Sequence, residues 1–268
     1  KKIIKNRKFD YEIFIKEVKD FMHAANIETW HILFPDEDIN KSLIDNNFIK
    51  RTGYKFIWNN KKYSSFEDYL EIFTSRQRKN IKNERNKIKK AGVSFDIKDK
   101  SNLVVQDWND FYAFYKNTYL QRLQEPYLNF EFFKGIHKKR KQLNPVIFFA
   151  EKDQKRVAAS LFFNRKSVLY GRNWGTSSNI DSLHFECCYY QGIDYCIQNN
   201  IMRFDPGVQG EYKIRRGFEP TKTYSYHYVI KKDFRDAIKE FCIKEETEVK
   251  NYIKACNRYT PIKKKYKI

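Results

Sequence analysis

The apolar and polar positions of the first part of the chain switch between helical and strand-like spacing. Phe14, Val18 and Phe21 recur at the spacing of an amphipathic helix, and a short apolar run that ends at Pro35 is typical of a buried strand. The expected order is a helix over 9–27, a strand over 29–34, a short helix over 36–47 and a strand over 48–58. This part of the chain therefore predicts helix, strand, helix, strand.

A longer series follows. A long, very basic helix is expected over 64–92, with Ser65 as its N-cap and Gly92 at its C-terminal stop. After it we expect a strand over 93–97, helices over 105–122 and 129–142, hairpin-connected strands over 146–152, 157–164 and 167–174, a helix over 183–200, strands over 202–207 and 224–230, and a final helix over 233–255.

This order of elements resembles that of the GNAT-type acyltransferases. In both, early helices precede an antiparallel three-strand meander, which is followed by a helix, a strand, a loop and a last strand. The predicted fold class is α+β, with a mixed, mostly antiparallel sheet flanked by helices. On this prediction, residues 65–268 form a complete GNAT-like unit and residues 1–64 form the C-terminal part of a first one.

Composition and charge narrow the possible partners. The 268 residues are 41% hydrophobic, which is enough for a real core, and the formal net charge is +20. This charge indicates an anionic partner, such as nucleic acid, an anionic lipid surface or a phosphorylated substrate. The competing interpretation is a solvated, lysine-rich surface. The five cysteines are odd in number and include no C-x-x-C pair, which predicts a reduced, cytoplasmic protein without disulfides or a zinc site.

Other classes of protein are disfavoured by what the sequence lacks. No segment has the length and apolar character of a membrane-spanning helix, and the first residues do not resemble a signal peptide, so we expect no stable membrane insertion. The five histidines lie far apart along the chain, so no metal site is expected. The chain has no initiating Met, which suggests that it begins inside a longer protein.

Polar groups crowd near predicted strand ends between residues 168 and 216. Gly171, Gly175 and Ser177 would let backbone approach a ligand closely, and Arg172 would add a cation. The stretch 172–177 comes close to the acyl-CoA pyrophosphate signature, but Ser177 stands where Gly or Ala is usual. An ordinary tight turn that needs glycine explains the pattern as well.

The predicted helix that begins near residue 183 carries unexpected polar side chains. His184 and Glu186 stand two positions apart, so they point in directions about 200° apart and cannot bind one metal from one helix face. Glu186 is flanked by Cys187 and Cys188, so we expect it to be part-buried and paired with Arg172, Arg215 or Arg216. His184 is equally well interpreted as an ordinary histidine at a helix start. The two cysteines are expected to fill the core rather than to act as nucleophiles.

A second dense stretch follows the strand expected over 202–207. Asp205 ends that strand, Gly207 turns the chain, and Glu211, Lys213 and Arg216 follow. Glycines and acidic groups this close to a strand end are typical of a pocket wall, although a solvated loop is the alternative.

Several stretches of the chain recur together in one known family. They are LYGRNWG, LHFECCYYQGIDYCI, RFDPGVQGEYKIRRGFEP and TYSYH, preceded by WHILF, RTGYKFIWNNKKYSSFEDYL, RQRKNIKNERNKIKKAG, YKNTYLQR and PYLNFEFF. In these stretches the chain resembles the FemAB-related predicted N-acyltransferases of peptidoglycan biosynthesis or recognition. The resemblance covers about residues 29–243. One departure is Ile57, where the family leads us to expect a histidine.

The resemblance implies two GNAT-like units and the transfer of an acyl or aminoacyl group to an amine acceptor. The donor would be acyl-CoA, as in GNAT relatives, or aminoacyl-tRNA, as in relatives that act on cell-wall precursors. A peptidoglycan precursor and tRNA are therefore the expected partners, and no tightly bound cofactor is expected. Direct attack by the amine, without a covalent enzyme intermediate, agrees with the lack of a convincing nucleophile–base pair.

Candidate roles follow from this chemistry. Glu186, Asp205 or His184 would act as the base or position the amine, and Tyr190 would protonate a leaving thiol or ribose hydroxyl. The candidate donor- or substrate-binding residues are Arg172, Trp174, Gly175, Ser177, Gly207, Glu211, Lys213 and Arg216.

Two other functions stay open on the sequence. The basic helix expected over 64–92 would suit an RNA-binding module, although Glu84 interrupts its charge run and Ile81 and Ile88 indicate a helix packed on a core with a solvated face. The other alternative is a catalytically inert GNAT-like scaffold that binds cell-wall fragments.

Overall fold

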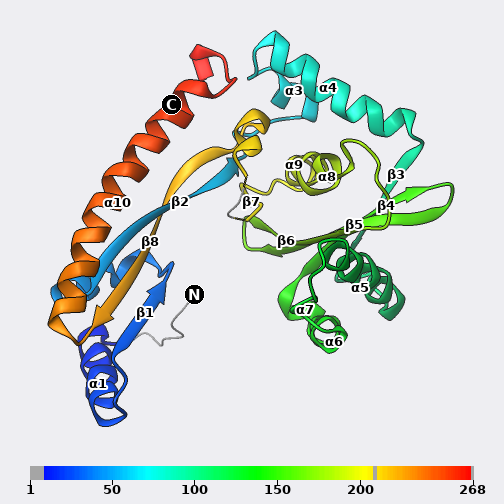
Figure 1. Ribbon diagram of the computed structural model, residues 1–268. Coiled ribbons are helices and arrows are strands. Elements are labelled where there is room, and N and C mark those ends of the chain that lie inside the picture. Colours follow the sequence, from blue (N-terminus) through cyan, green and yellow to red (C-terminus); the bar gives the residue numbers. More distant parts are fainter. Residues whose placement is uncertain (1–8, 208–209, 267–268) are drawn as a thin grey trace. The chain divides into compact units, whose positions relative to one another are not determined.

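The computed structural model describes residues 9–207 and 210–266 and divides the chain into two compact units (Figure 1). The first comprises Lys1–Lys55, as far as it is described, with Pro220–Tyr259, and the second comprises Phe56–Glu219 with Thr260–Ile268, again as far as described. These units do not coincide with 1–64 and 65–268, because the last long strand and helix return to the N-terminal part of the chain. The assignment of 1–64 to a first GNAT-like unit stays a prediction.

The first unit confirms the predicted helix–strand–helix–strand order. Its elements are α1 (Tyr11–Ala24), β1 (Thr29–Leu33), the short helices η1 (Glu37–Ile39) and α2 (Asn40–Asp45), the first part of β2 (Ile49–Asn59), most of β8 (Glu219–Val229) and α10 (Lys232–Tyr259). The strands lie in the order β1-β8-β2, with β1 and β8 antiparallel. Ile15, Ile32, Leu43, Phe48 and Tyr226 form its core.

The second unit holds most of the sheet. Its helices are α3 (Phe66–Leu70), α4 (Ser75–Lys90), α5 (Val105–Leu120), α6 (Phe130–Lys138), α7 (Arg140–Leu143), α8 (Leu183–Phe185), η2 (Glu186–Tyr190), α9 (Gln191–Gln198), η3 (Glu211–Arg216) and η4 (Lys264–Tyr266). Its strands are β3 (Val93–Asp99), β4 (Pro145–Lys152), β5 (Lys155–Arg165), β6 (Val168–Thr176) and β7 (Arg203–Asp205), in the order β2-β7-β6-β5-β4-β3. Only β6 and β7 pair in parallel among these strands as described. The predicted fold class, a mostly antiparallel mixed sheet flanked by helices, is confirmed.

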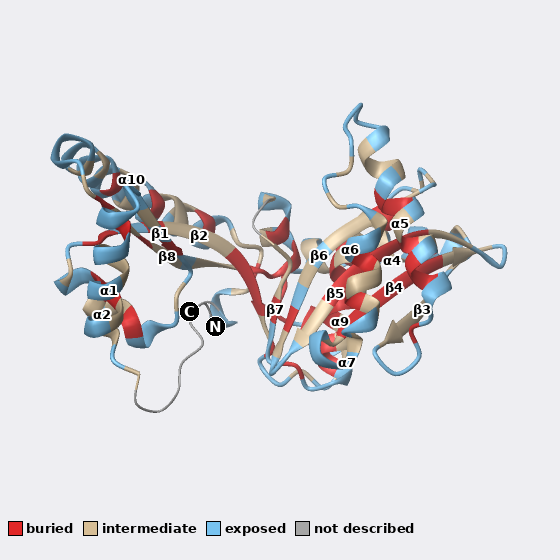
Figure 2. Ribbon diagram, turned by 90° about the horizontal axis from the view of Figure 1, so that it is seen from below, coloured by how far each residue is buried: buried red, intermediate tan, exposed pale blue. Residues whose placement is uncertain are grey.

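Each face of this sheet is covered by helices. Successive side chains of a strand point to opposite faces, so neighbouring residues pack against different helices. Phe149 and Leu161 of β4 and β5 pack into the aromatic cluster of α5 and α6. Ala150 and Ala158 face the opposite way, onto Leu183 of α8. Figure 1 shows α5 and α6 on one side of β4–β6 and α8 and α9 on the other, and Figure 2 shows β4 and β5 buried over much of their length. The sequences of the middle strands are therefore nearly continuous runs of apolar residues, because both faces of these strands are buried.

The basic segment 64–92 differs from the prediction, because it forms two helices instead of one. Ser65 caps α3 through a hydrogen bond from Asp68 N–H, as expected, but Thr74 caps α4 separately. The break holds the fully buried Phe73, which forms a β-bridge with Ile262. This contact comes from the far end of the chain, so helical periodicity alone does not reveal the break. Gly92 follows the C-terminus of α4 with a φ of 70°, as its predicted role requires.

Candidate functional site

Strands β6 and β7 pair over a short parallel register and then separate. The paired residues are Val168 with Arg203, Leu169 with Phe204 and Tyr170 with Asp205. β7 ends at Asp205, whereas β6 continues to Thr176 along β5. Pro206 still lies against Gly171, where an added Cβ would come 3.2 Å from Pro206 Cα. Beyond this point the described part of β7 no longer follows β6, which leaves one edge of β6 open.

Residues 172–176 belong to strand β6, which ends at Thr176, so the tight-turn interpretation is wrong. Arg172 occupies a β-bulge, because Leu161 pairs with Asn173 and Phe162 with Gly171. Its side chain is exposed. Ser177 follows the strand, and both its N–H and its Oγ hydroxyl donate to the Val157 carbonyl oxygen, at 2.9 and 3.2 Å.

Gly175 and Trp174 face opposite sides of the sheet. A Cβ at Gly175 would lie 2.2 Å from the carbonyl carbon of Phe114, so glycine is needed here for the contact between β6 and α5. The role of Gly175 in donor binding stays a prediction. Trp174 points to the other face, where its ring centroid lies 5.4 Å from that of His184.

His184 lies in an aromatic enclosure beside the open edge of β6. Trp174, Tyr189 and Tyr212 contact its ring, with centroids 5.4, 5.5 and 6.3 Å away. Burial lowers the pKa of His184 to about 4, and the charges of Arg216, Arg122 and Lys213 act in the same direction. The imidazole is therefore uncharged at neutral pH and can accept a proton.

Glu186 begins a π-helical turn, so the helix predicted over 183–200 is not a continuous α-helix. The turn, η2, joins α8 to α9, and such turns are frequent at functional sites. Glu186 is 3% exposed, and its Oε1 accepts from Arg85 Nε at 3.1 Å and from Gln191 Nε2 at 2.8 Å. Its buried Oε2 has no hydrogen-bond partner among the described residues. Burial raises the pKa of Glu186 despite the charge of Arg85.

A cavity of about 540 Å³ borders the outer side of this ion pair. Arg85 and Asp194 line it, and Arg85 also bonds Asp194 Oδ2 at 3.3 Å. The expectation that Glu186 is buried and paired with an arginine is confirmed, although the partner is Arg85 rather than Arg172, Arg215 or Arg216.

Tyr190 and Arg216 converge on Glu84 of the basic helix α4. The Tyr190 hydroxyl donates to Glu84 Oε2, and Arg216 NH2 donates to the same oxygen at 2.7 Å. The Arg216 guanidinium also lies 3.5 Å from the ring centroid of Phe185. Burial raises the pKa of Tyr190, which keeps its hydroxyl protonated as a donor. The buried Nε of Arg216 has no hydrogen-bond partner within the described ranges.

The loop after β7 is held from inside by Lys213. Its ammonium donates to the Gly207 carbonyl oxygen at 2.7 Å, and burial lowers its pKa to about 8. Asp205 Oδ1 accepts from the Gly207 N–H at 3.1 Å. Glu211 is exposed. Residues 208 and 209, which the sequence places in the same pocket wall, lie outside the described residues.

The predicted residues thus fall into separate groups rather than one constellation. Trp174, His184, Lys213 and Arg216 converge near the open edge of β6, whereas Glu186 turns away toward α4 and α9. The opposite directions expected for His184 and Glu186 agree with these partners. Sequence reasoning missed Arg85, and it treated Glu84 only as a break in a basic run. The presence of Glu84 within that basic run was the one sign in the sequence that an acidic side chain of this helix faces inward.

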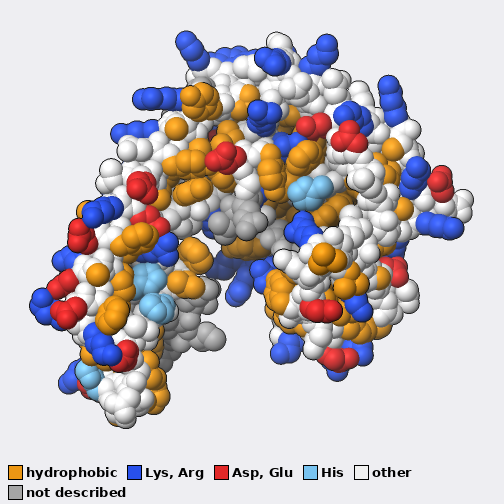
Figure 3. All heavy atoms as spheres, in the orientation of Figure 1, with side chains coloured by type: hydrophobic (Ala, Val, Ile, Leu, Met, Phe, Trp, Pro, Cys, Tyr) orange, Lys and Arg blue, Asp and Glu red, His pale blue; other side chains and the backbone are white. Residues whose placement is uncertain are grey.

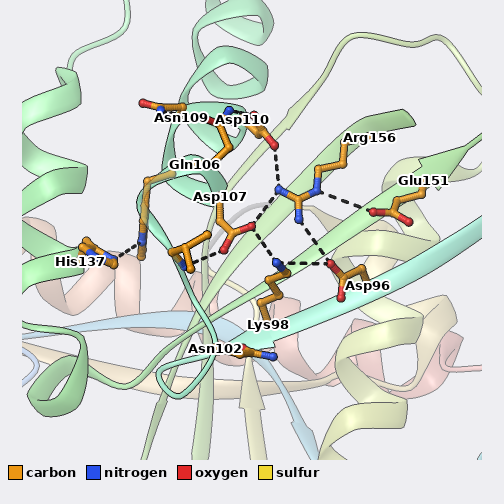
Figure 4. A network of polar contacts seen from close by, with 12 residues as sticks. Asp96, Lys98, Asn102, Gln106, Asp107, Asn109, Asp110, His137, Glu151 and Arg156 are labelled. Atoms are coloured by element: carbon orange, nitrogen blue, oxygen red, sulfur yellow. Dashed lines mark hydrogen bonds and ion pairs between the residues drawn. The ribbon is translucent and has the colours of Figure 1, made fainter. Parts of the chain in front are cut away.

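A second charged cluster lies on the opposite face of the sheet, under α5 (Figure 4). Arg156 of β5 contacts the carboxylates of Asp107 and Asp110 through NH1, at 2.9 and 2.7 Å, and that of Asp96 through NH2, at 3.4 Å. Lys98 Nζ lies 3.1 Å from Asp107 Oδ1, and Val104 N–H donates to Asp107 Oδ2 at 2.8 Å. These groups satisfy one another and tie the start of α5 to β3 and β5.

Three of the eight basic residues of α4 form ion pairs within the described part of the chain. Arg78, Arg85 and Lys87 pair with Glu71, Glu186 and Asp181, respectively. On the face drawn in Figure 3, Lys and Arg side chains are spread out with Asp and Glu between them, rather than gathered into one patch. The other basic residues of α4 are exposed, so the RNA-binding alternative stays a prediction.

Three further observations on residues 9–207 and 210–266 concern metal ligands, membrane spans and cysteines. No group of three or more His, Cys, Asp or Glu side chains in this part of the chain is arranged to hold a metal ion. None of the helices described there is long and apolar enough to cross a membrane. The cysteines are free thiols, and burial raises the pKa of Cys187 to about 12, which makes it a poor nucleophile.

Comparisons with known proteins place the chain in a class. Solved structures share the mixed, mostly antiparallel sheet flanked by helices. FemX aligns with a TM-score of 0.60 at 12% identity, over 86% of this chain and 80% of FemX. The C-terminal domain of a protein described as a lysylphosphatidylglycerol synthetase from Agrobacterium fabrum aligns with a TM-score of 0.61 at 9% identity, over 86% of this chain and 76% of that domain. L-PGS from Bacillus licheniformis aligns with a TM-score of 0.56 at 12% identity, covering 80% and 73% of the two chains.

The family follows from the sequence match. The FemAB-like family model, described as peptidoglycan biosynthesis/recognition, matches residues 2–264, so the chain belongs to this family. The resemblance predicted from the quoted stretches is confirmed. No curated protein matches the chain.

Proposed function

We propose that the protein is an N-acyltransferase that moves an acyl or aminoacyl group to the amine of a cell-wall precursor. The observation that carries the proposal is His184, an uncharged imidazole beside the open edge of β6. Membership of a family described by peptidoglycan biosynthesis or recognition supports the acceptor class, and the resemblance to the FemAB-related predicted N-acyltransferases supports the reaction type.

The geometry supports a simple division of roles. His184 accepts a proton from the neutral amine as that amine attacks, because its imidazole is uncharged and has a free lone pair. The amine nitrogen bonds to the acyl carbon, and the bond from that carbon to the leaving oxygen or sulfur breaks. The leaving group takes up the proton that His184 accepted. Lys213 and Arg216 would bind a phosphate group of the donor or acceptor. Both are positively charged, and both lie close enough to His184 to lower its pKa.

The remaining predicted residues take supporting places in this proposal. Tyr190 is fixed by Glu84 and holds Arg216 in position through their shared carboxylate. Asp205 orients the Gly207 turn. Glu186 is a less direct candidate for the base, because its partners lie toward α4. The donor is acyl-CoA or aminoacyl-tRNA, used as a co-substrate.

The test is turnover with purified full-length chain. We expect a new amide, detected by mass spectrometry, when the protein is mixed with an amine-bearing peptidoglycan precursor and either acyl-CoA or aminoacyl-tRNA. His184→Phe keeps the aromatic packing and removes the base, so we expect the rate to fall by about 100-fold or more. The exposed His23 of α1 supplies the control, His23→Ala, which should keep full activity.

Two outcomes would count against the proposal. One is full activity in His184→Phe with an unchanged melting temperature. The other is no turnover with any of these donors by folded protein. A salt-dependent RNA complex without turnover would support the RNA-binding alternative.

A further inference from the structure

Two histidines of the first unit meet across neighbouring strands. His31 of β1 and His227 of β8 are directly opposite in the antiparallel register. Their Nδ1 atoms are 2.8 Å apart, and their ring centroids are 5.0 Å apart. They are 196 positions apart in the chain, so the spacing along the sequence gave no sign of the pair. His31 is exposed, which leaves the pair open to solvent.

Two ring nitrogens this close together need a hydrogen atom or a metal ion between them. A neutral imidazole has one N–H and one lone pair, so two facing lone pairs at this distance would repel each other. Either one proton or one metal ion resolves the repulsion. His227 Nε2 lies 2.9 Å from Ser225 Oγ. In the tautomer that donates Nε2–H to this oxygen, His227 Nδ1 presents its lone pair to His31, which is the arrangement that a metal ligand requires.

We infer that His31 and His227 form a binding site for a divalent transition-metal ion, held by the two Nδ1 atoms and completed by water. With metal–nitrogen distances of about 2.0–2.1 Å, two nitrogens 2.8 Å apart subtend roughly 85° at the ion. This angle is close to that of adjacent ligands in a square-planar or octahedral complex, which Cu²⁺ and Ni²⁺ prefer, and is smaller than the tetrahedral angle of zinc sites.

The surroundings set the character of the site. Glu245 is the nearby acid, but Arg51 holds its carboxylate through two contacts of 2.7 Å. Two protein ligands with open coordination positions make a modest-affinity site. Since β1 is an end strand that pairs only with β8 in the described sheet, a bound ion would pin this strand to its neighbour.

The experiment is a titration of tag-free, full-length protein with Cu²⁺ and Ni²⁺, followed by calorimetry and by electron paramagnetic resonance of the Cu²⁺ complex. We expect one saturable site, hyperfine coupling to two imidazole nitrogens, and a higher melting temperature with metal. Losing a residue that only supports a metal ligand typically weakens binding by roughly 10- to 100-fold. His31→Ala removes a ligand itself, so it should weaken binding by at least this much. His227→Ala should behave alike, and Ser225→Ala should weaken binding less.

The matched control is His23→Ala, which removes an exposed histidine of the same unit and should bind metal as the native chain does. Because His31 is exposed, His31→Ala is expected to fold, and its melting temperature without metal checks this. Unchanged metal affinity in folded His31→Ala overturns the inference. So does the absence of saturable binding up to about 1 mM metal.

Discussion

Each of the two faces of the sheet in the second unit pairs arginine with acidic side chains, but the two networks differ in completeness. Under α5, Arg156 meets the carboxylates of Asp96, Asp107 and Asp110, and the buried Asp107 is bonded through both of its oxygens. On the opposite face, Glu186 Oε2 is buried without a hydrogen-bond partner among the described residues, and so is Arg216 Nε.

This difference separates a structural network from a candidate functional one. Burying a polar atom without a partner costs about 1–3 kcal/mol, so proteins rarely leave such atoms except where a ligand or a task requires them. The pKa values follow the same division. Burial raises the pKa of Asp107, but hydrogen bonds from Val104, Lys98 and Arg156 outweigh it and leave the value lowered, whereas the pKa of Glu186 is raised.

The largest effect should come from breaking the complete network. Asp107→Ala removes a carboxylate that is 2% exposed in its side chain and leaves Arg156 and Lys98 without their shared partner. We expect a loss of about 3–5 kcal/mol in the free energy of unfolding, measured by urea denaturation. Asp110→Asn, at a more exposed member of the network, should lose clearly less. Equal losses in the two variants would show that Asp107 is not the centre of the network.

A smaller effect should come from His184 on the opposite face, as a fall in the free energy of unfolding at acid pH. The pKa of His184 is about 4 in the folded chain against an ordinary value of 6.5, so the unfolded chain binds a proton first as pH falls. This contribution to stability is complete above pH 6.5 and is lost between pH 6.5 and 4, by at most about 3 kcal/mol. The curve of unfolding free energy against pH for His184→Phe should be flatter across that window. Parallel curves for the two proteins would contradict the burial of a neutral imidazole.

The smallest effect on stability should come from the incomplete network itself. Because the pKa of Glu186 is raised, its charged form is disfavoured in the fold, and stability is lost as pH rises through that pKa. Glu186→Gln should therefore change the free energy of unfolding at pH 7 by less than about 1 kcal/mol, or increase it. Thermal unfolding at pH 5 and pH 7 checks this, with Glu186→Ala as the cavity-forming comparison. A loss as large as that of Asp107→Ala would erase the distinction between the two faces.

The candidate site was only partly readable from the sequence. His184, Lys213 and Arg216 were recognised because polar groups beside strand ends and glycines are unusual. Arg85 was missed because it lies in a run of basic residues whose helical spacing also fits a solvated face. Only when α4 packs on η2 do Arg85 and Glu84 turn inward to Glu186 and Tyr190.

The sequence by itself determined the order and type of most elements, the meander of β4 to β6 and the fold class, because periodicity and turn residues act over short distances. Tertiary structure decided the break between α3 and α4, the return of β8 to β1 and the meeting of His31 with His227. Each of these depends on residues far apart in the chain, whose contact is set by the packing of whole strands and leaves no local pattern.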